Sequence, residues 1–157
     1  MRKVYLALFT LGLTSWLSIS LGGEDWTLDQ NAIIDANDGY IRAILSEDLD
    51  LLMTYYAEDV TLLPPMSPPI KGKNAVRAYW AEGMKQTTVI EAESTLDEIL
   101  VFGNWAYSRG RYKGKSIPDD GGHEYDDKLN FSGMWHRNED GSWRIARDMW
   151  NSGASDH

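Results

Sequence analysis

The sequence contains no cysteine among its 157 residues. Disulfide bonds, thiol nucleophiles and thiolate metal ligands are therefore excluded, and so is a lipid anchor attached through cysteine. A chain of this length buries enough apolar surface to fold as one domain without such support. The absence of cysteine fits a reducing or an oxidising compartment equally well.

Basic residues are also in the minority. The chain carries 15 Lys and Arg against 24 Asp and Glu, a formal net charge of −9. Residues 1–20 contribute two of the positive charges and no acid, so the remainder of the chain carries −11. A negative field of this size repels phosphate backbones. We therefore expect no nucleic-acid partner.

The first 20 residues form the one long, mostly apolar run of the sequence. Arg2 and Lys3 precede residues 4–17, and Ser18 and Ser20 are small residues suited to cleavage after Ser20. This pattern predicts a secretory signal peptide over residues 1–20 and a periplasmic or secreted protein. Several Thr and Ser residues interrupt the run, so it would span a bilayer poorly. The alternative is an uncleaved signal, which would be the chain's only attachment to a membrane.

Aromatic residues are plentiful, with seven Trp and eight Tyr. The overall 43% hydrophobic and 25% charged residues are typical of a soluble globular domain. Wide aromatic side chains suit a core that lines a cavity as well as filling space.

The hydrophobic periodicity predicts helices followed by strands. Ile33, Ile34, Ile41 and Ile44 recur at helical spacing. We predict a leader over residues 21–28, one domain over 29–152, a tail over 153–157 and a polar loop over 117–127. Within the domain, helices are predicted over residues 29–46, 49–56 and 74–84, and strands over 60–63, 87–102, 105–115, 128–137 and 142–152. Helices first and an antiparallel meander afterwards indicate the α+β class.

Several short segments, in this order and at this spacing, carry a family resemblance. They are residues 56–59, 72–80, 106–112, Trp135 and 140–152, the last with the pattern Asp-Gly-Ser-Trp-Arg-Ile. Together they resemble the SnoaL-like family, also labelled DUF4440, of the NTF2-like superfamily. The resemblance implies a cone in which three N-terminal helices pack on a curved antiparallel sheet that encloses a pocket. It implies little about activity, because this superfamily holds enzymes and non-catalytic binders alike.

Ketosteroid isomerase, which shares this superfamily, offers a comparison residue by residue. The resemblance places Tyr40 where that enzyme keeps its oxyanion-hole tyrosine, a donor to developing negative charge. It places Pro64 where the enzyme has its general-base aspartate. It places Ser132 or Gly133 where the enzyme has a second, protonated acid. Two of the three functional groups are missing, so the resemblance does not imply the mechanism of that enzyme.

Asp148 is our first candidate for a catalytic residue. Side chains of the last strand are expected to alternate strictly between its two faces. One face carries Arg144, Ala146, Asp148 and Trp150, and the other carries Trp143, Ile145, Arg147 and Met149. The resemblance implies that the face of Asp148 and Trp150 points into the pocket, where desolvation would raise the pKa of the carboxyl and suit it to general-base catalysis. The alternative is a salt bridge to Arg109 or Arg111. Small residues on the opposite face of their strand favour an outward direction for both arginines; the reverse would make the pocket an anion site.

The other candidate residues are ligand-binding. Asn37 falls within the apolar arc of the first helix and Tyr40 at its edge, and each is either a paired core residue or a polar group of the pocket. Aromatic residues expected to bind ligand are Tyr56, Trp80, Tyr112, Trp135 and Trp150. The acidic segment around His123 fits no metal-binding spacing, so we expect no metal and no cofactor.

Two functions stay open at this point. One is a non-catalytic protein that binds a small, largely apolar molecule. The other is an enzyme of the isomerase, dehydratase or hydrolase type, in which Asp148 is the base and Tyr40 and Asn37 are polarising donors. A homodimer is also expected, formed through an outer sheet face bearing Trp105, Tyr107 and Trp143.

Overall fold

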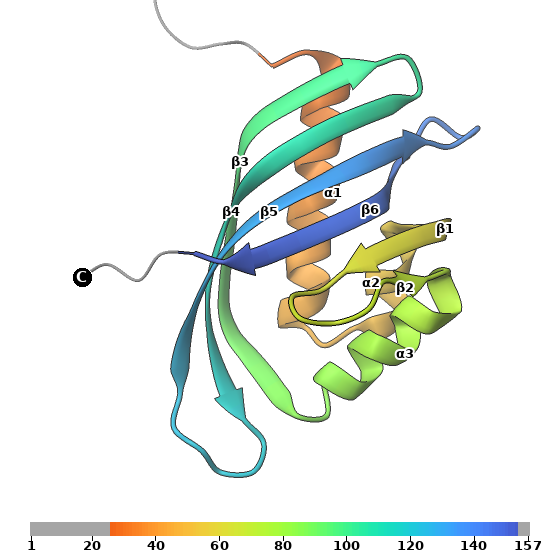
Figure 1. Ribbon diagram of the computed structural model, residues 1–157. Coiled ribbons are helices and arrows are strands. Elements are labelled where there is room, and N and C mark those ends of the chain that lie inside the picture. The colour runs from red at the N-terminus through yellow and green to blue at the C-terminus, as the bar shows by residue number, and fades with distance from the viewer. Residues whose placement is uncertain (1–25, 154–157) are drawn as a thin grey trace, which may run out of the picture.

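Residues 26–153 are described by the structure, a computed structural model of the chain. The predicted signal peptide, residues 21–25 of the predicted leader and residues 154–157 of the predicted tail lie outside this range. The described residues form three helices and one sheet. Figure 1 shows that the sheet is strongly bent and that the long helix α1 (Leu28–Leu45) lies against one of its faces. The α+β architecture predicted from the sequence is confirmed.

The elements follow the predicted order of helices first and a meander afterwards. They are α1 (Leu28–Leu45), α2 (Leu49–Thr54), β1 (Tyr56–Leu63), β2 (Ile70–Lys71), α3 (Lys73–Gly83), β3 (Thr87–Phe102), β4 (Trp105–Pro118), β5 (Tyr125–Arg137) and β6 (Trp143–Ser152). Each predicted helix and strand has a counterpart here, and β2 is an addition. None of the helices in residues 26–153 is long and apolar enough to cross a membrane.

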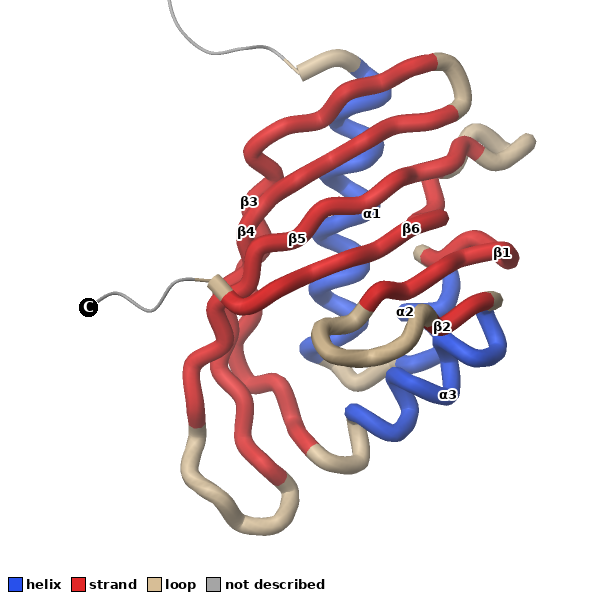
Figure 2. Tube along the Cα trace, in the orientation of Figure 1, coloured by secondary structure: helices blue, strands red, loops and turns tan. Residues whose placement is uncertain are grey.

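The sheet is mixed rather than purely antiparallel. Its six strands lie in the order β2-β1-β6-β5-β4-β3, and β1 pairs with β6 in parallel while the other neighbours are antiparallel. The expectation of an antiparallel sheet was wrong at this one pair. The reason is connectivity: α3 and strands β3 to β5 lie between β1 and β6 in the chain (Figure 2), and β6 runs beside β1 in the same direction, as the arrows of Figure 1 show.

Strand pairing also explains where the predicted boundaries differ. Tyr56 pairs with Ile145, so β1 begins at a residue assigned to the second helix by the sequence pattern. Ser116 pairs with Tyr125, which lengthens β4 and β5 into the predicted polar loop and leaves residues 119–124 as the connection. Neighbouring strands supply hydrogen-bond partners that local sequence does not reveal.

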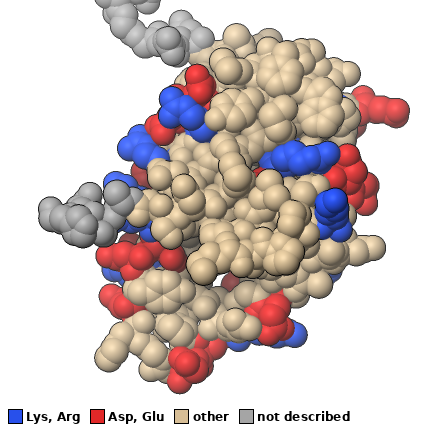
Figure 3. Space-filling model, in the orientation of Figure 1, with Lys and Arg blue, Asp and Glu red and all other residues tan. Residues whose placement is uncertain are grey.

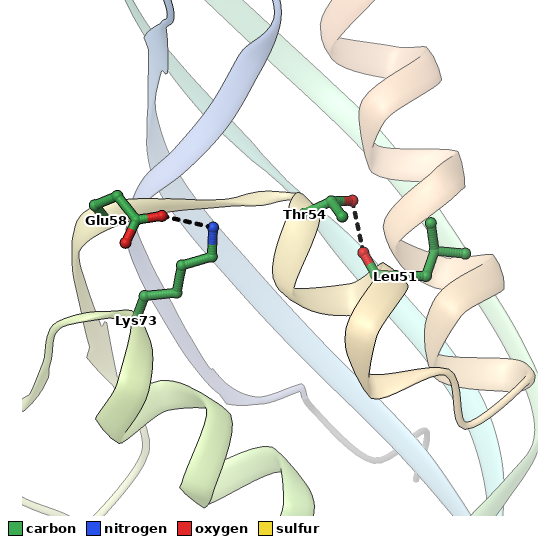
Figure 4. A network of polar contacts seen from close by, with 4 residues as sticks. All are labelled: Leu51, Thr54, Glu58 and Lys73. Carbon is green, nitrogen blue, oxygen red and sulfur yellow. Dashed lines mark hydrogen bonds and ion pairs between the residues drawn. The ribbon is translucent and has the colours of Figure 1, made fainter.

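Local polar contacts fix the helices that carry the site. Thr27 and Gln30 form a reciprocal capping box at the start of α1. Lys73, the first residue of α3, forms an ion pair of 2.9 Å with Glu58 of β1, and Thr54 closes the end of α2 through the Leu51 carbonyl at 2.7 Å (Figure 4). These contacts set the start of α3 against β1, and α3 carries Trp80 toward the core.

One irregularity in β6 changes which side chains face inward. Trp135 pairs with Ile145 and Met134 pairs with Arg147, so Ala146 is an extra residue, a β-bulge. The bulge shifts the alternation by one position. Trp143, 2% exposed, and Ile145 therefore face the core on one side of the bulge, and Asp148 and Trp150 face inward on the other. Our prediction that Trp143 lies on the outer face was wrong for this reason.

Candidate functional site

A cavity of about 390 Å³ lies between α1, α3 and the inner face of the sheet. This volume is within the range of small-molecule sites. Strand β5 shows how the sheet supplies its wall, because every second residue points into the space. The residues it contributes are Tyr125, Asp127, Leu129, Phe131, Gly133 and Trp135.

Asp148 points into this cavity without a positive partner. Its Oδ2 atom accepts a hydrogen bond from the Tyr56 hydroxyl at 3.3 Å, and no described residue donates to Oδ1. None of the ion pairs within residues 26–153 includes Asp148. Burial raises the pKa of this carboxyl to about 6, against the lowering effect of the Tyr56 hydrogen bond.

The arginines considered as partners of Asp148 lie on the other face of the sheet. Arg109 pairs with Glu98 at 2.9 Å, and Arg111 pairs with Asp97 at 2.7 Å. Both arginine side chains are more than half exposed. Their outward direction agrees with the prediction, and the alternative of a salt bridge to Asp148 was wrong. The cavity is accordingly not an anion site built from these arginines.

The Tyr56 hydroxyl connects Asp148 to two other residues of the site. It accepts a hydrogen bond from Trp80 Nε1 at 3.0 Å and lies 3.0 Å from the Tyr40 hydroxyl. A phenol has a single proton to donate, and Tyr56 donates this proton to Asp148 when Asp148 is ionised. Tyr40 must then donate to Tyr56, which leaves only acceptor lone pairs on Tyr40 for a ligand.

Tyr56 itself does not reach the cavity surface. It is 1% exposed and lies behind Tyr40, Trp80 and Asp148. The structure therefore corrects the expectation that Tyr56 contacts ligand: its hydroxyl positions the three groups that do line the space. Burial, as the largest cause, raises the pKa of both Tyr40 and Tyr56 well above the usual value for tyrosine, so both stay protonated at neutral pH.

Four aromatic rings line the cavity together with Asp148. The ring centroids of Tyr40 and Trp80 are 6.3 Å apart, those of Tyr79 and Trp80 are 5.8 Å apart, and both pairs are edge-to-face. Trp150 lies 6.4 Å from Tyr79. All four side chains line the cavity. Among them, Trp80 and Trp150 occupy the positions expected of ligand-contacting aromatics.

Asn37 and Trp135 are two buried residues that line the cavity. Asn37 is 6% exposed, and its Oδ1 atom accepts a hydrogen bond from Ser94 at 3.4 Å. Its amide nitrogen donates to no described residue, so it is free to donate into the cavity. Trp135 donates from Nε1 to the buried Ser108 hydroxyl at 2.9 Å, which leaves only its ring for contact with a ligand.

A second polar group lies at the other end of β5. Asp127 lines the cavity and accepts a hydrogen bond from the Ser116 hydroxyl at 2.8 Å. Tyr112 is adjacent, and burial together with the charge of Asp127 raises the pKa of Tyr112 to about 12. Asp148 pairs with Gly133, six residues along β5 from Asp127, so roughly 20 Å of strand separates the two carboxylates. Leu129 and Phe131 line the cavity between them.

Sequence reasoning missed some of these residues. Asp127 was assigned to a solvated loop, and its inward direction follows only from the extension of β5 to Tyr125. Tyr79, within the predicted helix over residues 74–84, was given no role, although its place beside Trp80 was a usable signal. Within the described range, no group of three or more His, Asp or Glu side chains is arranged to hold a metal ion.

The fold and the cavity together define a class. Three helices packed on a bent mixed sheet, with a pocket between them, form the α+β architecture of the NTF2-like superfamily. Residues 37–147 match the model of the SnoaL-like domain, and the chain belongs to that family. No protein of curated function matches the sequence.

Solved structures similar to this chain share the fold. A ketosteroid isomerase-like protein of Erwinia carotovora atroseptica has a TM-score of 0.75 at 18% identity, with 83% of this chain and all of that chain covered. A conserved protein of Planctomyces limnophilus has a TM-score of 0.69 at 26% identity, covering 80% and 98%. An NTF2-like superfamily protein of Salmonella enterica has a TM-score of 0.70 at 18% identity, covering 81% and 92%.

Two positions that the ketosteroid isomerase resemblance singled out can now be placed. Pro64 is buried and lines no part of the cavity, so the position matched to the general base of that enzyme lies outside the site. Gly133 lines the cavity directly across from Asp148 in the β5–β6 pair. The resemblance expects the second acid of ketosteroid isomerase at this position of β5, and the present chain has a carboxylate on the neighbouring strand, at Asp148 of β6.

The unpaired carboxyl gives the first prediction, a stability gain in Asp148→Asn. The folded pKa of about 6 exceeds the value near 3.9 of an unfolded chain, so the native state binds the extra proton between these limits. Wild-type stability should therefore fall, relative to the variant, by on the order of 2–3 kcal/mol as pH rises from about 4 to about 6. Urea unfolding at several pH values measures the difference.

The matched control is Asp97→Asn, which removes the same charge from the outer face. The pKa of Asp97 is lowered, chiefly by its hydrogen bond from Arg111, so Asp97 stabilises the fold at neutral pH and loses this effect as pH falls. The two variants should deviate from wild type in opposite directions. A difference between Asp148→Asn and wild type that does not change with pH would contradict the raised pKa.

Proposed function

We propose that this protein binds a small, largely apolar molecule in the cavity. The single observation that supports this most strongly is the cavity itself, about 390 Å³ in volume and lined mainly by aromatic and aliphatic side chains. Polar groups interrupt this lining, among them Asn37, Asp148 and Asp127, which come from α1, β6 and β5. Sites for small apolar ligands combine these two features, since the apolar wall gives affinity and the polar groups give orientation.

Adjacent residues on β3 test the proposal. Val89 lines the cavity, whereas Ile90 is 41% exposed and does not. Val89→Trp should place an indole in the ligand space and weaken binding of 2-naphthol, an apolar probe, by at least about tenfold. Ile90→Trp adds the same ring outside and should leave affinity unchanged. Isothermal titration calorimetry gives both values, with circular dichroism to check folding. Equal affinities in the two variants would place the probe elsewhere.

A second candidate function is proton transfer, with Asp148 as the general base. The unpaired carboxylate with a pKa of about 6 favours it, because a base near neutrality is effective when its pKa lies close to the working pH. Oδ1 is available to take a proton while Oδ2 accepts from Tyr56. Asn37 then supplies a free donor for developing negative charge. Tyr40 serves this role less well than the sequence suggested, because its proton is directed to Tyr56.

An activated probe tests this base without a known substrate. 5-Nitrobenzisoxazole loses its carbon-bound proton to a base as its N–O bond opens, giving a coloured phenolate. The rate should rise with pH through about 6, where Asp148 ionises, and level off above. Asp148→Asn should reduce it about 100-fold or more, since a positioned base contributes 10²–10⁴-fold. Asp97→Asn, on the outer face, should retain the wild-type rate. An unchanged rate in Asp148→Asn would show that Asp148 is not the general base.

We also propose that two copies associate through the outer face of the sheet. Leu100 and Phe102 of β3, Trp105 of β4 and Met149 of β6 are between 36% and 51% exposed. Phe102 pairs with Trp105, and Leu100 pairs with Tyr107, so these side chains share one face. Uncharged atoms cover most of this face in Figure 3, with charged side chains mainly toward its edges. Exposed apolar patches of this kind mark protein contacts.

A charge placed on this face tests the association. Leu100→Glu should convert a dimer at micromolar concentration into a monomer, because a buried unpaired carboxylate opposes the contact. Met66→Glu serves as the control, since Met66 is fully exposed in the loop after β1 and should leave the dimer intact. Sedimentation velocity measures both. A wild-type monomer at this concentration would refute the proposed dimer.

A further inference from the structure

The charge of the cavity wall is of one sign. The three ionised side chains that line it are Glu47, Asp127 and Asp148, and no Lys, Arg or His of residues 26–153 lines it. Arg109 and Arg111 of β4 point outward and form ion pairs there. A carboxylate or phosphate ligand would meet repulsion throughout this space, whereas a cation would meet none.

Of the three acids, Asp148 is the one whose surroundings are least favourable for a negative charge. It is desolvated, its one hydrogen-bond donor among the described residues is Tyr56, and it shares the cavity wall with aromatic rings and with no Lys, Arg or His of residues 26–153. A carboxylate in such surroundings is costly unless a positive charge accompanies it. A positively charged ligand can form with Asp148 the ion pair that no residue within 26–153 forms.

The rings around Asp148 are arranged to accept the same kind of group. Tyr40 and Trp80 meet edge-to-face, as do Trp80 and Tyr79, and Trp150 completes the set beside Tyr79. Each edge-to-face contact occupies one face of one ring in the pair, and all four rings line the cavity, so ring faces not used in these contacts are available to a ligand. Trp and Tyr faces attract ammonium groups, most strongly where water is excluded. The Asp148 carboxylate and these four rings therefore present two complementary features for one cation.

From this juxtaposition we propose that the ligand is a protonated amine with an apolar, ring-sized body. Its ammonium group lies between Asp148 Oδ1 and the rings of Tyr40, Tyr79, Trp80 and Trp150. Its body lies along Leu129 and Phe131, toward the end of the cavity where Asp127 is available for a second donor. The net charge of −9 draws such cations toward the protein. The inference rests on the proposed binding function and names the class of ligand.

Binding an ammonium group and acting as a general base require opposite values of the Asp148 pKa. A cation beside Asp148 lowers its pKa, whereas base catalysis near neutral pH depends on the raised value. One ligand therefore cannot use Asp148 in both ways. The amine proposal favours the binding function over proton transfer at this residue.

Three matched probes test the proposal on the full chain. They are 2-(2-naphthyl)ethylamine, the neutral 2-(2-naphthyl)ethanol and the anionic 2-naphthylacetate, which share a ring system. At pH 7.5 we expect calorimetry to give at least about tenfold tighter binding of the amine than of the alcohol, the scale of one desolvated charge contact. The acid should bind more weakly than the alcohol. The advantage of the amine should decrease progressively as pH falls below about 6 and Asp148 is protonated, while the amine stays charged.

Two variants locate the effect. Asp148→Asn should abolish the preference for the amine over the alcohol, because it removes the charge while Asn can still accept from Tyr56. Asp97→Asn removes an equal charge from the outer face and should keep the preference. A preference that survives in Asp148→Asn would overturn the assigned position.

The remaining outcomes separate the inference from the function on which it rests. If the alcohol binds as tightly as the amine, the amine proposal is wrong and the apolar binding function stands. If none of the three probes binds, while Val89→Trp and wild type also behave alike toward 2-naphthol, the binding function itself is lost. Tighter binding of the acid than of the amine would contradict the electrostatic basis of both the ligand class and its placement.

Discussion

The hydroxyl of Tyr56 is the contact on which the arrangement of the site depends. It donates to Asp148, accepts from Trp80 and lies within hydrogen-bond distance of Tyr40. These groups come from β6, α3 and α1, so one buried atom links the sheet to two helices. A buried polar group must find partners, and three elements can meet around Tyr56 only in one arrangement. Tyr56 therefore determines the direction of the side chains that face the cavity without facing it itself.

The second constraint is that the sheet keeps its positive charges outside. Arg109 and Arg111 lie on the same face of β4 and point outward to Glu98 and Asp97. Ser108 and Tyr112 lie on the opposite face and line the cavity. Asp148 consequently has no cationic partner within residues 26–153, and burial raises the pKa of its carboxyl to about 6. Such a group destabilises the folded chain at neutral pH, which is a common feature of functional sites. The same charge is the basis of both functions considered for the pocket, as a base or as the counter-ion of an amine.

Much of the fold was predictable because its signals are local. The helical spacing of Ile33, Ile41 and Ile44 predicted α1, and the span of β3 was predicted as residues 87–102. The outward direction of Arg109 and the inward direction of Tyr112 followed from the small residues of β4. Predictions failed where pairing between distant strands decides the outcome. The bulge at Ala146 buried Trp143 against the strict alternation of β6, and the extension of β5 turned Asp127 from a loop residue into part of the cavity wall.

The sequence by itself determined the α+β class, the family resemblance, the negative charge and the candidacy of Asp148, Tyr40, Asn37 and the aromatic residues, because these depend on composition, periodicity and short motifs. Only the tertiary structure decided that Asp148 lacks an ion pair, that Tyr56 lies behind the cavity wall and that Tyr40 directs its proton to Tyr56. These properties depend on distances between atoms of β1, β6, α1 and α3, segments up to 92 residues apart in the chain. Hydrogen bonds and desolvation act over a few ångströms of space, whatever the separation along the chain.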